Sequence, residues 1–115
     1  MKLITAIIRP EKLSAVHRAL LDAEITRITV SRCTGHGQQG GVELYRGATV
    51  EPDLLPKVRL DIACNDSFVE IAVAALIKAA RSTEEGGRVG DGKIFIAPLD
   101  DCIRIRTGER GGQAI

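Results

Sequence analysis

Residues 57–64, Lys57-Val58-Arg59-Leu60-Asp61-Ile62-Ala63-Cys64, alternate between apolar and mostly polar side chains. Successive side chains of a β-strand point to opposite faces of the sheet, so this alternation predicts a strand with one apolar and one largely polar face. It is the clearest element in the chain, and the neighbouring elements can be placed on either side of it.

The sequence before this strand predicts a strand, a helix and a second strand. Residues 2–9 are rich in isoleucine, which is typical of a strand buried on both faces. Pro10 ends that strand and is suited to the first turn of a helix. The apolar positions that follow recur at spacings of three and four, and they are Leu13, Val16 and Leu20. They predict an amphipathic helix of about 12 residues, and the β-branched residues of 25–34 predict the second strand.

The sequence after residue 64 predicts a second helix and two further strands. Asp66 or Ser67 is a suitable N-cap for the helix. Its predicted buried stripe consists of Phe68, Ile71, Ala72, Ala75, Leu76 and Ala79. The glycine-rich segment 82–92 predicts a loop, 93–97 a fourth strand, and 103–106 a short fifth in which isoleucine and arginine alternate.

The resulting order, β-α-β-β-α-β, is that of an α+β ferredoxin-like sandwich. With 115 residues, one domain over 1–115 is expected. Only three side chains are aromatic, so the core is thin, and oligomerisation is a common remedy in a chain this small.

Composition excludes several functional classes. The 16 basic and 15 acidic side chains leave a net charge of +1, which gives no field for holding nucleic acid. No apolar run approaches the roughly 20 residues of a membrane span, and the N-terminus lacks a secretory signal, so we expect a cytoplasmic protein without direct membrane insertion. The three cysteines are too far apart for a disulfide framework or a structural metal site. They are Cys33, Cys64 and Cys102, and the last two are expected in the core.

About 20 residues, Gly35 to Leu55, separate the second and third strands, where a hairpin loop usually takes 2–5. A loose surface insertion is one interpretation. The other is a partner-contacting loop, because Tyr45 and Arg46 near its far end are residue types enriched at binding hot spots.

Several cationic and glycine-rich positions suggest a phosphate site. Glycines in residues 90–93, Gly-Asp-Gly-Lys, let backbone N–H groups surround an anion, and the lysine adds a charge. Arg104 and Arg106 would share one face of a strand, and Lys57 adds a further cation. An ordinary turn and a solvated pair of arginines are the alternatives. We find no constellation typical of catalysis, so the chain is not expected to be an enzyme.

Five blocks of sequence resemble the PII signal-transduction proteins, which are nitrogen regulators, and the resemblance runs from Met1 to Ile115. The blocks are Ala6-Ile7-Ile8-Arg9-Pro10, Glu43-Leu44-Tyr45-Arg46-Gly47-Ala48, Leu55-Pro56-Lys57-Val58, Gly90-Asp91-Gly92-Lys93-Ile94-Phe95 and Ile103-Arg104-Ile105-Arg106-Thr107-Gly108-Glu109. The resemblance implies a homotrimer that binds ATP or ADP between subunits. It also implies a target such as an ammonium channel or a metabolic enzyme, contacted through a T-loop at about 36–55 that includes Tyr45 and Arg46. A B-loop at about 82–92 and a C-loop at about 104–110 would complete the nucleotide site.

The resemblance also assigns individual residues. The implied nucleotide-binding residues are Ile7, Ile28, Thr29, Gly35, Gly37, Gln38, Gln39, Lys57, Ala63, Val89, Gly90, Asp91, Gly92, Lys93, Arg104 and Arg106, the last two reaching in from a neighbouring subunit. Gln39 and Lys57 would bind 2-oxoglutarate, and Gln39 would contribute to a Mg²⁺ ion bridging ATP and that keto acid.

Three features depart from the family pattern. Val50 stands where the family carries the tyrosine that is uridylylated, the loop base at 38–41 is one residue shorter, and the B-loop is about four residues longer and includes Glu84 and Glu85. A divergent sensor of another small anion or metabolite is therefore one alternative. A ferredoxin-like enzyme or metal-handling domain is the other.

Overall fold

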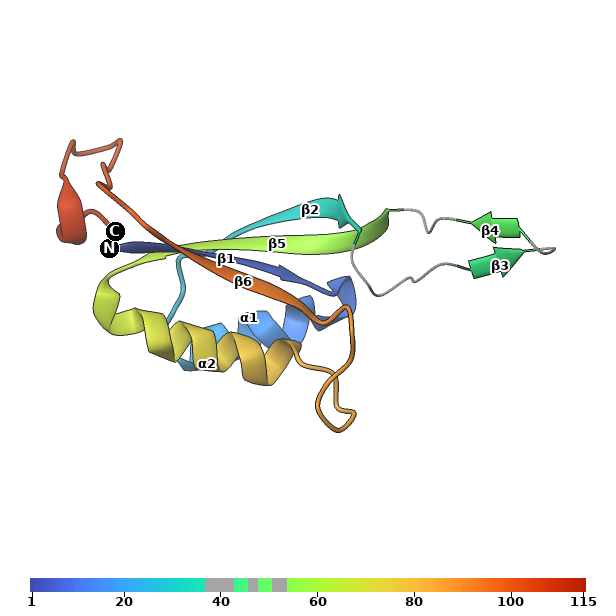
Figure 1. Cartoon of the computed structure of the whole chain (residues 1–115). Helices are drawn as coiled ribbons and strands as arrows, with labels where there is room; N and C mark the ends of the chain where they lie inside the picture. The colour runs from blue at the N-terminus through green and yellow to red at the C-terminus, as the bar shows by residue number, and fades with distance from the viewer. Residues whose placement is uncertain (37–42, 46–47, 51–53) are drawn as a thin grey trace.

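The computed structural model describes residues 1–36, 43–45, 48–50 and 54–115. Its main body is a four-stranded antiparallel sheet in the order β2-β5-β1-β6, with two helices packed on one face (Figure 1). The sheet strands are β1 (Lys2–Ile8), β2 (Thr29–Gly35), β5 (Leu55–Cys64) and β6 (Gly92–Pro98). The helices are α1 (Leu13–Asp22) and α2 (Val69–Ala80), and short 3₁₀ turns lie at Pro10–Lys12, Asp66–Phe68 and Gly111–Gln113. The α+β ferredoxin-like order predicted from the sequence is confirmed.

The core lies between the helices and one face of the sheet. In the strand register Ile4 lies opposite Ile62, and Ala6 opposite Leu60, and all four side chains are buried. The helices contribute Val16, Leu20, Ala72 and Leu76 to the same cluster. The prediction that the first strand is buried on both faces is wrong for the single chain: Leu3, Thr5 and Ile7, on the face away from the helices, are only half-buried.

The start of the second helix also differs from the prediction. Residues 66–68 form a 3₁₀ turn, so the N-cap of this turn is Asn65 and that of α2 is Phe68, and neither makes a side-chain capping hydrogen bond. The tighter turn changes the phase of the helix that follows. As a result, Val69 and Ala80 are buried, whereas Phe68 and Ile71, expected in the buried stripe, are exposed.

The second strand begins at Thr29 rather than at Ile25. Ile25 is buried, but its backbone N–H bonds to Leu20 O at the end of α1, directly after Glu24 with a φ of 64°. The connection that leaves α1 therefore includes Ile25, a residue whose propensity favours a strand. Of the two cysteines expected in the core, Cys64 is buried and Cys102 is half-buried.

The predicted fifth strand at 103–106 is wrong. Ile103 makes only an isolated bridge to Arg110, and the residues between them form a turn. The Gly108 N–H donates to Arg104 O at 2.7 Å, and Gly108 has a φ of 73°. These local bonds take up the backbone groups that a strand would pair, so Arg104 and Arg106 do not share a strand face.

The long connection between β2 and β5 contains a second, two-stranded sheet formed by β3 (Glu43–Tyr45) and β4 (Ala48–Val50). Figure 1 shows this hairpin beyond the end of the four-stranded sheet. Tyr45 lies on β3, whereas Gly37, Gln38, Gln39 and Arg46 lie outside the described residues. In the described part of the chain, neither helix has the length and apolar character needed to cross a membrane.

Candidate functional site

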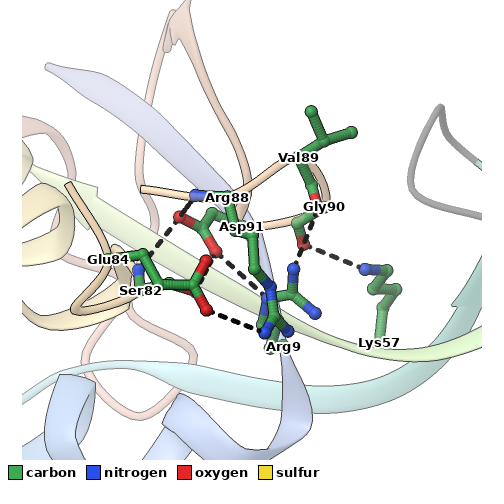
Figure 2. A network of polar contacts seen from close by, with 8 residues as sticks. All are labelled: Arg9, Lys57, Ser82, Glu84, Arg88, Val89, Gly90 and Asp91. Atoms are coloured by element: carbon green, nitrogen blue, oxygen red, sulfur yellow. Dashed lines mark hydrogen bonds and ion pairs between the residues drawn. The ribbon is translucent and has the colours of Figure 1, made fainter. Parts of the chain in front are cut away.

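The candidate site lies at the end of the sheet where β6 begins. There the loop of residues 82–91 connects the end of α2 to β6 and lies next to the end of β1 (Figure 1). Figure 2 shows Lys57 of β5, Arg9 at the end of β1 and the loop residues converging. Three segments far apart in the sequence thus meet at one corner of the molecule.

Asp91 is the centre of a hydrogen-bond network at this corner. Its Oδ1 accepts from Arg9 Nε at 3.1 Å and from Ser82 Oγ at 2.5 Å. Its Oδ2 accepts from the backbone N–H groups of Ser82 and Arg88, both at 2.9 Å. Arg9 is the one buried charged side chain among the described residues, with 5% of its surface exposed. The carboxylate supplies a buried guanidinium with the charged partner it requires.

Burial and these contacts shift the pKa values of Asp91 and Lys57. Burial by itself raises the pKa of Asp91, but the hydrogen bonds from Ser82, Arg88 and Arg9 outweigh it and hold the pKa far below its usual range. Burial lowers the pKa of Lys57, and the nearby positive charge of Arg9 lowers it further. At neutral pH Asp91 is therefore ionised.

Gly92 joins the loop to β6 in a place that no other residue fits. Its φ is 119°, and a Cβ at this position would lie 1.8 Å from the backbone oxygen of Ile7. The close approach of β6 to β1 at the register pair Ile8–Gly92 thus depends on the missing side chain. This is the physical reason for the second glycine in Gly90-Asp91-Gly92-Lys93.

Two carbonyl groups of the loop are turned toward cations of the core. Val89 O accepts from Arg9 Nη2 at 2.9 Å, and Gly90 O accepts from Lys57 Nζ at 3.1 Å. The two ends of a trans peptide point in opposite directions, so the Gly90 N–H is directed away from Arg9. A backbone N–H that points away from Arg9, on a residue contacted by Lys57, fits an anionic group such as a phosphate.

Six of the predicted nucleotide-binding residues are brought together here. They are Lys57, Val89, Gly90, Asp91, Gly92 and Lys93. Ile7 lies opposite Lys93 in the sheet, and a Cβ at Gly35 of β2 would lie 3.6 Å from Lys57 Cγ. The exposed Lys93 follows Gly92 directly on β6.

Other predicted residues lie farther along the sheet. Thr29 opens β2 opposite Asp61, Ile28 packs beside the core just before it, and Ala63 lies opposite Leu3 near the start of β1. Ala63 is six residues from Lys57 on the same strand, which corresponds to about 20 Å.

Arg104 and Arg106 are not brought to the loop. The C-terminal segment that holds them lies at the opposite end of the sheet (Figure 1). Arg104 donates to Glu109 Oε1 at 3.0 Å and to Gln113 O at 3.2 Å. These arginines are predicted to reach a nucleotide from a neighbouring subunit, and within one chain this stays a prediction.

Sequence reasoning assigned no role to Arg9 and Ser82. The available signal for Arg9 was its position, an arginine at the end of an isoleucine-rich strand and directly before Pro10. Its partner Asp91 is 82 residues away in the chain, and no local pattern predicts that contact. Across the described residues, no three His, Cys, Asp or Glu side chains cluster in a way that could hold a metal ion.

Comparison with known proteins identifies the family of this chain. The family model described as "Nitrogen regulatory protein P-II" matches residues 1–109. The chain is 50% identical to a nitrogen regulatory protein P-II of Azospirillum brasilense and 49% identical to one of Rhodospirillum rubrum, over the full length of both proteins in each pair. It is 46% identical to the nitrogen regulatory protein GlnK1 of Methanosarcina mazei, over all of this chain and 97% of that protein. The names indicate regulators in signal transduction rather than enzymes. The chain therefore belongs to the family of nitrogen regulatory P-II proteins.

Proposed function

We propose that this P-II chain binds ATP or ADP at the corner formed by residues 88–93 and Lys57, and that it does so as a homotrimer. The observation that carries the proposal is the Val89–Gly90 turn, whose carbonyls accept from Arg9 and Lys57 and whose Gly90 N–H points away from Arg9. A nucleotide's phosphates would accept from backbone N–H groups there and pair with Lys57 and Lys93.

The cationic side chains of the proposed site lie at two opposite ends of the sheet, and this arrangement supports a site shared between subunits. Arg104 and Arg106 lie at the far end of the sheet from Lys93, so one chain alone supplies only part of the proposed set (Figure 1). A neighbouring copy that places its C-loop, about 104–110, over the B-loop, about 82–92, would complete it. Closed cyclic assemblies readily form such sites between identical chains.

The base and the effector are assigned to the remaining residues. Ile7, Ile28, Thr29 and Ala63 would surround the adenine, and the base of the T-loop would close over the nucleotide with Gly35, Gly37, Gln38 and Gln39. Lys57 and Gln39 would bind 2-oxoglutarate, and Gln39 would help hold a Mg²⁺ ion between it and ATP. A divalent cation neutralises phosphate charge and prefers oxygen ligands.

Regulation would follow from ligand-dependent arrangement of the T-loop, about 36–55. Tyr45 and Arg46 would contact a target such as an ammonium channel or a metabolic enzyme. The ligand shifts the population of loop conformations only by as much as its affinity differs between them.

Two measurements test the proposal. Calorimetry with ATP and ADP, each with and without Mg²⁺ and 2-oxoglutarate, should show nucleotide binding, and light scattering should give about three times the chain mass of 12.3 kDa. Absence of any nucleotide response at millimolar concentration would contradict the proposed function.

A mixing experiment tests the shared site. Lys93→Ala and Arg104→Ala should each weaken ATP binding by about tenfold or more, since each removes a charge-assisted contact. When the two variants are unfolded together and refolded as mixed trimers, about a quarter of the clefts combine an intact Lys93 with an intact Arg104 from its neighbour. Recovery of that fraction of wild-type sites supports the shared site. No recovery in verified mixed trimers contradicts it.

A further inference from the structure

The Asp91 side chain is directed into the protein and not toward a ligand. Each carboxylate oxygen already accepts two hydrogen bonds, from Arg9 and Ser82 on Oδ1 and from the Ser82 and Arg88 backbone on Oδ2. Only 19% of the side chain is exposed. A carboxylate with four donors has little capacity left, and its charge would repel a phosphate.

The four donors come from defined places in the fold. Ser82 begins the loop and Arg88 stands six residues later, so one carboxylate joins the two ends of this stretch. Arg9 belongs to the core of the sheet and also holds Val89 O. Asp91 therefore ties both ends of the loop to a buried guanidinium, as Figure 2 shows.

The residues between these two ends form a small closed turn of their own. The Gly87 N–H donates to Glu84 O at 2.8 Å, and Arg88 Nη1 lies 3.3 Å from Glu84 Oε1. Gly86 and Gly87 both have positive φ, which lets the chain turn back sharply. The turn at 83–87 thus has contacts of its own, and its length need not alter the shape of the anion-binding part.

We infer that Asp91 is a positioning residue that gives residues 88–92 their anion-binding shape through Arg9 and Ser82, without contacting the ligand, and that it isolates the turn at 83–87 from the site. This rests on the proposed nucleotide function. The charge of the carboxylate by itself would repel a phosphate, but the carboxylate favours binding because it orders the donors that bind phosphate.

The two possible roles of Asp91 predict opposite changes in ATP affinity. If Asp91 acts only as a nearby charge, Asp91→Asn removes repulsion and tightens ATP binding. If it orders the loop, Asp91→Asn replaces one acceptor oxygen by an NH₂ group facing donors, and binding weakens. Glu84→Gln is the matched control, because it removes the same charge from the turn at 83–87 and Glu84 makes none of the four Asp91 contacts.

The experiment measures the dissociation constant of MgATP by calorimetry for the wild type and both variants, with circular dichroism to verify folding. We expect Asp91→Asn to raise the constant by about tenfold or more, as for a lost hydrogen bond to a charged group, and Glu84→Gln to change it less than about twofold. Unchanged or tighter binding by folded Asp91→Asn would overturn the inference.

Hydrogen exchange on the ligand-free proteins separates this inference from the proposed function. The backbone amides of Ser82 and Arg88 should lose protection in Asp91→Asn and keep it in Glu84→Gln. If wild-type protein binds no ATP but these amides lose protection, the nucleotide proposal fails and the ordering role of Asp91 stands. If the amides exchange at wild-type rates in Asp91→Asn, the inference fails whatever the protein binds.

Discussion

The loop at residues 82–92 and the C-terminal segment at 99–115 both carry cationic or glycine-rich motifs expected to bind phosphate, yet they are held in different ways. The loop is fixed by a buried ion pair between Arg9 and Asp91, with side chains 5% and 19% exposed. The C-terminal segment is held by exposed pairs, Arg104–Glu109 at 3.0 Å and Arg110–Asp101 at 2.8 Å.

This difference shows which part of the proposed site one chain forms by itself. A buried ion pair with four hydrogen bonds gives one loop shape, because every alternative leaves a charge without a partner in the protein interior. Exposed pairs contribute little, since water and salt compete with them. The loop at 82–92 therefore has its hydrogen-bond network within the single chain, whereas we expect the C-terminal segment to gain its final contacts from a neighbouring subunit.

The largest expected effect comes from the glycine that ends the loop. Gly92→Ala would place a Cβ 1.8 Å from Ile7 O at a φ of 119°, so β6 must move away from β1. We expect the free energy of unfolding to fall by about 3 kcal/mol or more, measured by urea denaturation at fixed protein concentration. The matched control is Gly108→Ala in the C-terminal segment, with a φ of 73° and no atom within 4 Å of the new Cβ. For Gly108→Ala we expect the free energy of unfolding to fall by about 1 kcal/mol. Equal losses would remove the distinction between the two regions.

The next effect concerns the carboxylates that organise each region. Asp91→Ala leaves the buried Arg9 without its carboxylate, and we expect the free energy of unfolding to fall by about 2–4 kcal/mol. Asp101 accepts from Arg110 and from two backbone N–H groups but is exposed. Asp101→Ala should therefore change the urea midpoint much less. A larger loss for Asp101 than for Asp91 would show that the C-terminal segment, and not the loop, is the more firmly held region.

The difference in pH dependence of stability between the wild type and Asp91→Asn should report on the loop. Hydrogen bonds outweigh burial and hold the pKa of Asp91 below its ordinary value of about 3.9. The stability from this ionised carboxylate is fully present above that value, and it is lost as the pH falls below about 4 toward the folded-state pKa. The difference in unfolding free energy between wild type and Asp91→Asn should thus be equal at pH 7 and pH 5 and smaller at pH 3. A constant difference over this range would mean that Asp91 is not held as an ionised partner of Arg9.

The smallest expected effect is in the C-terminal segment. Glu109→Gln removes the charge that faces Arg104, with side chains 43% and 31% exposed. We expect the free energy of unfolding to change by less than ~0.5 kcal/mol, as for other exposed ion pairs. Urea denaturation in low and high salt checks this, because a small screened interaction fades as salt rises. A loss comparable to that of Asp91→Ala would show that the C-terminal segment is held as firmly as the loop at 82–92.

Much of the fold could be predicted because its signals are local. The alternation at 57–64 and the apolar spacing of Leu13, Val16 and Leu20 report which face of each element is apolar. The predictions that failed involve competition between neighbours: the 3₁₀ turn before α2 and the turn at Gly108 use local hydrogen bonds that override propensity. In the described part of the site, the glycine motif at 90–93 was recognisable from its residues.

The sequence by itself determined the order of elements, the family and the glycine motif, because periodicity and short motifs depend on residues that are close in the chain. Only the tertiary structure decided what Arg9 and Asp91 do, since 82 residues separate them and their pairing depends on how β1 and β6 align. It also decided that Arg104 lies far from Lys93 in the single chain. Burial converts the first pair from two ordinary charges into an ordering contact, because a guanidinium removed from water requires a partner. Exposure leaves Arg104 with a weak contact that another chain can replace.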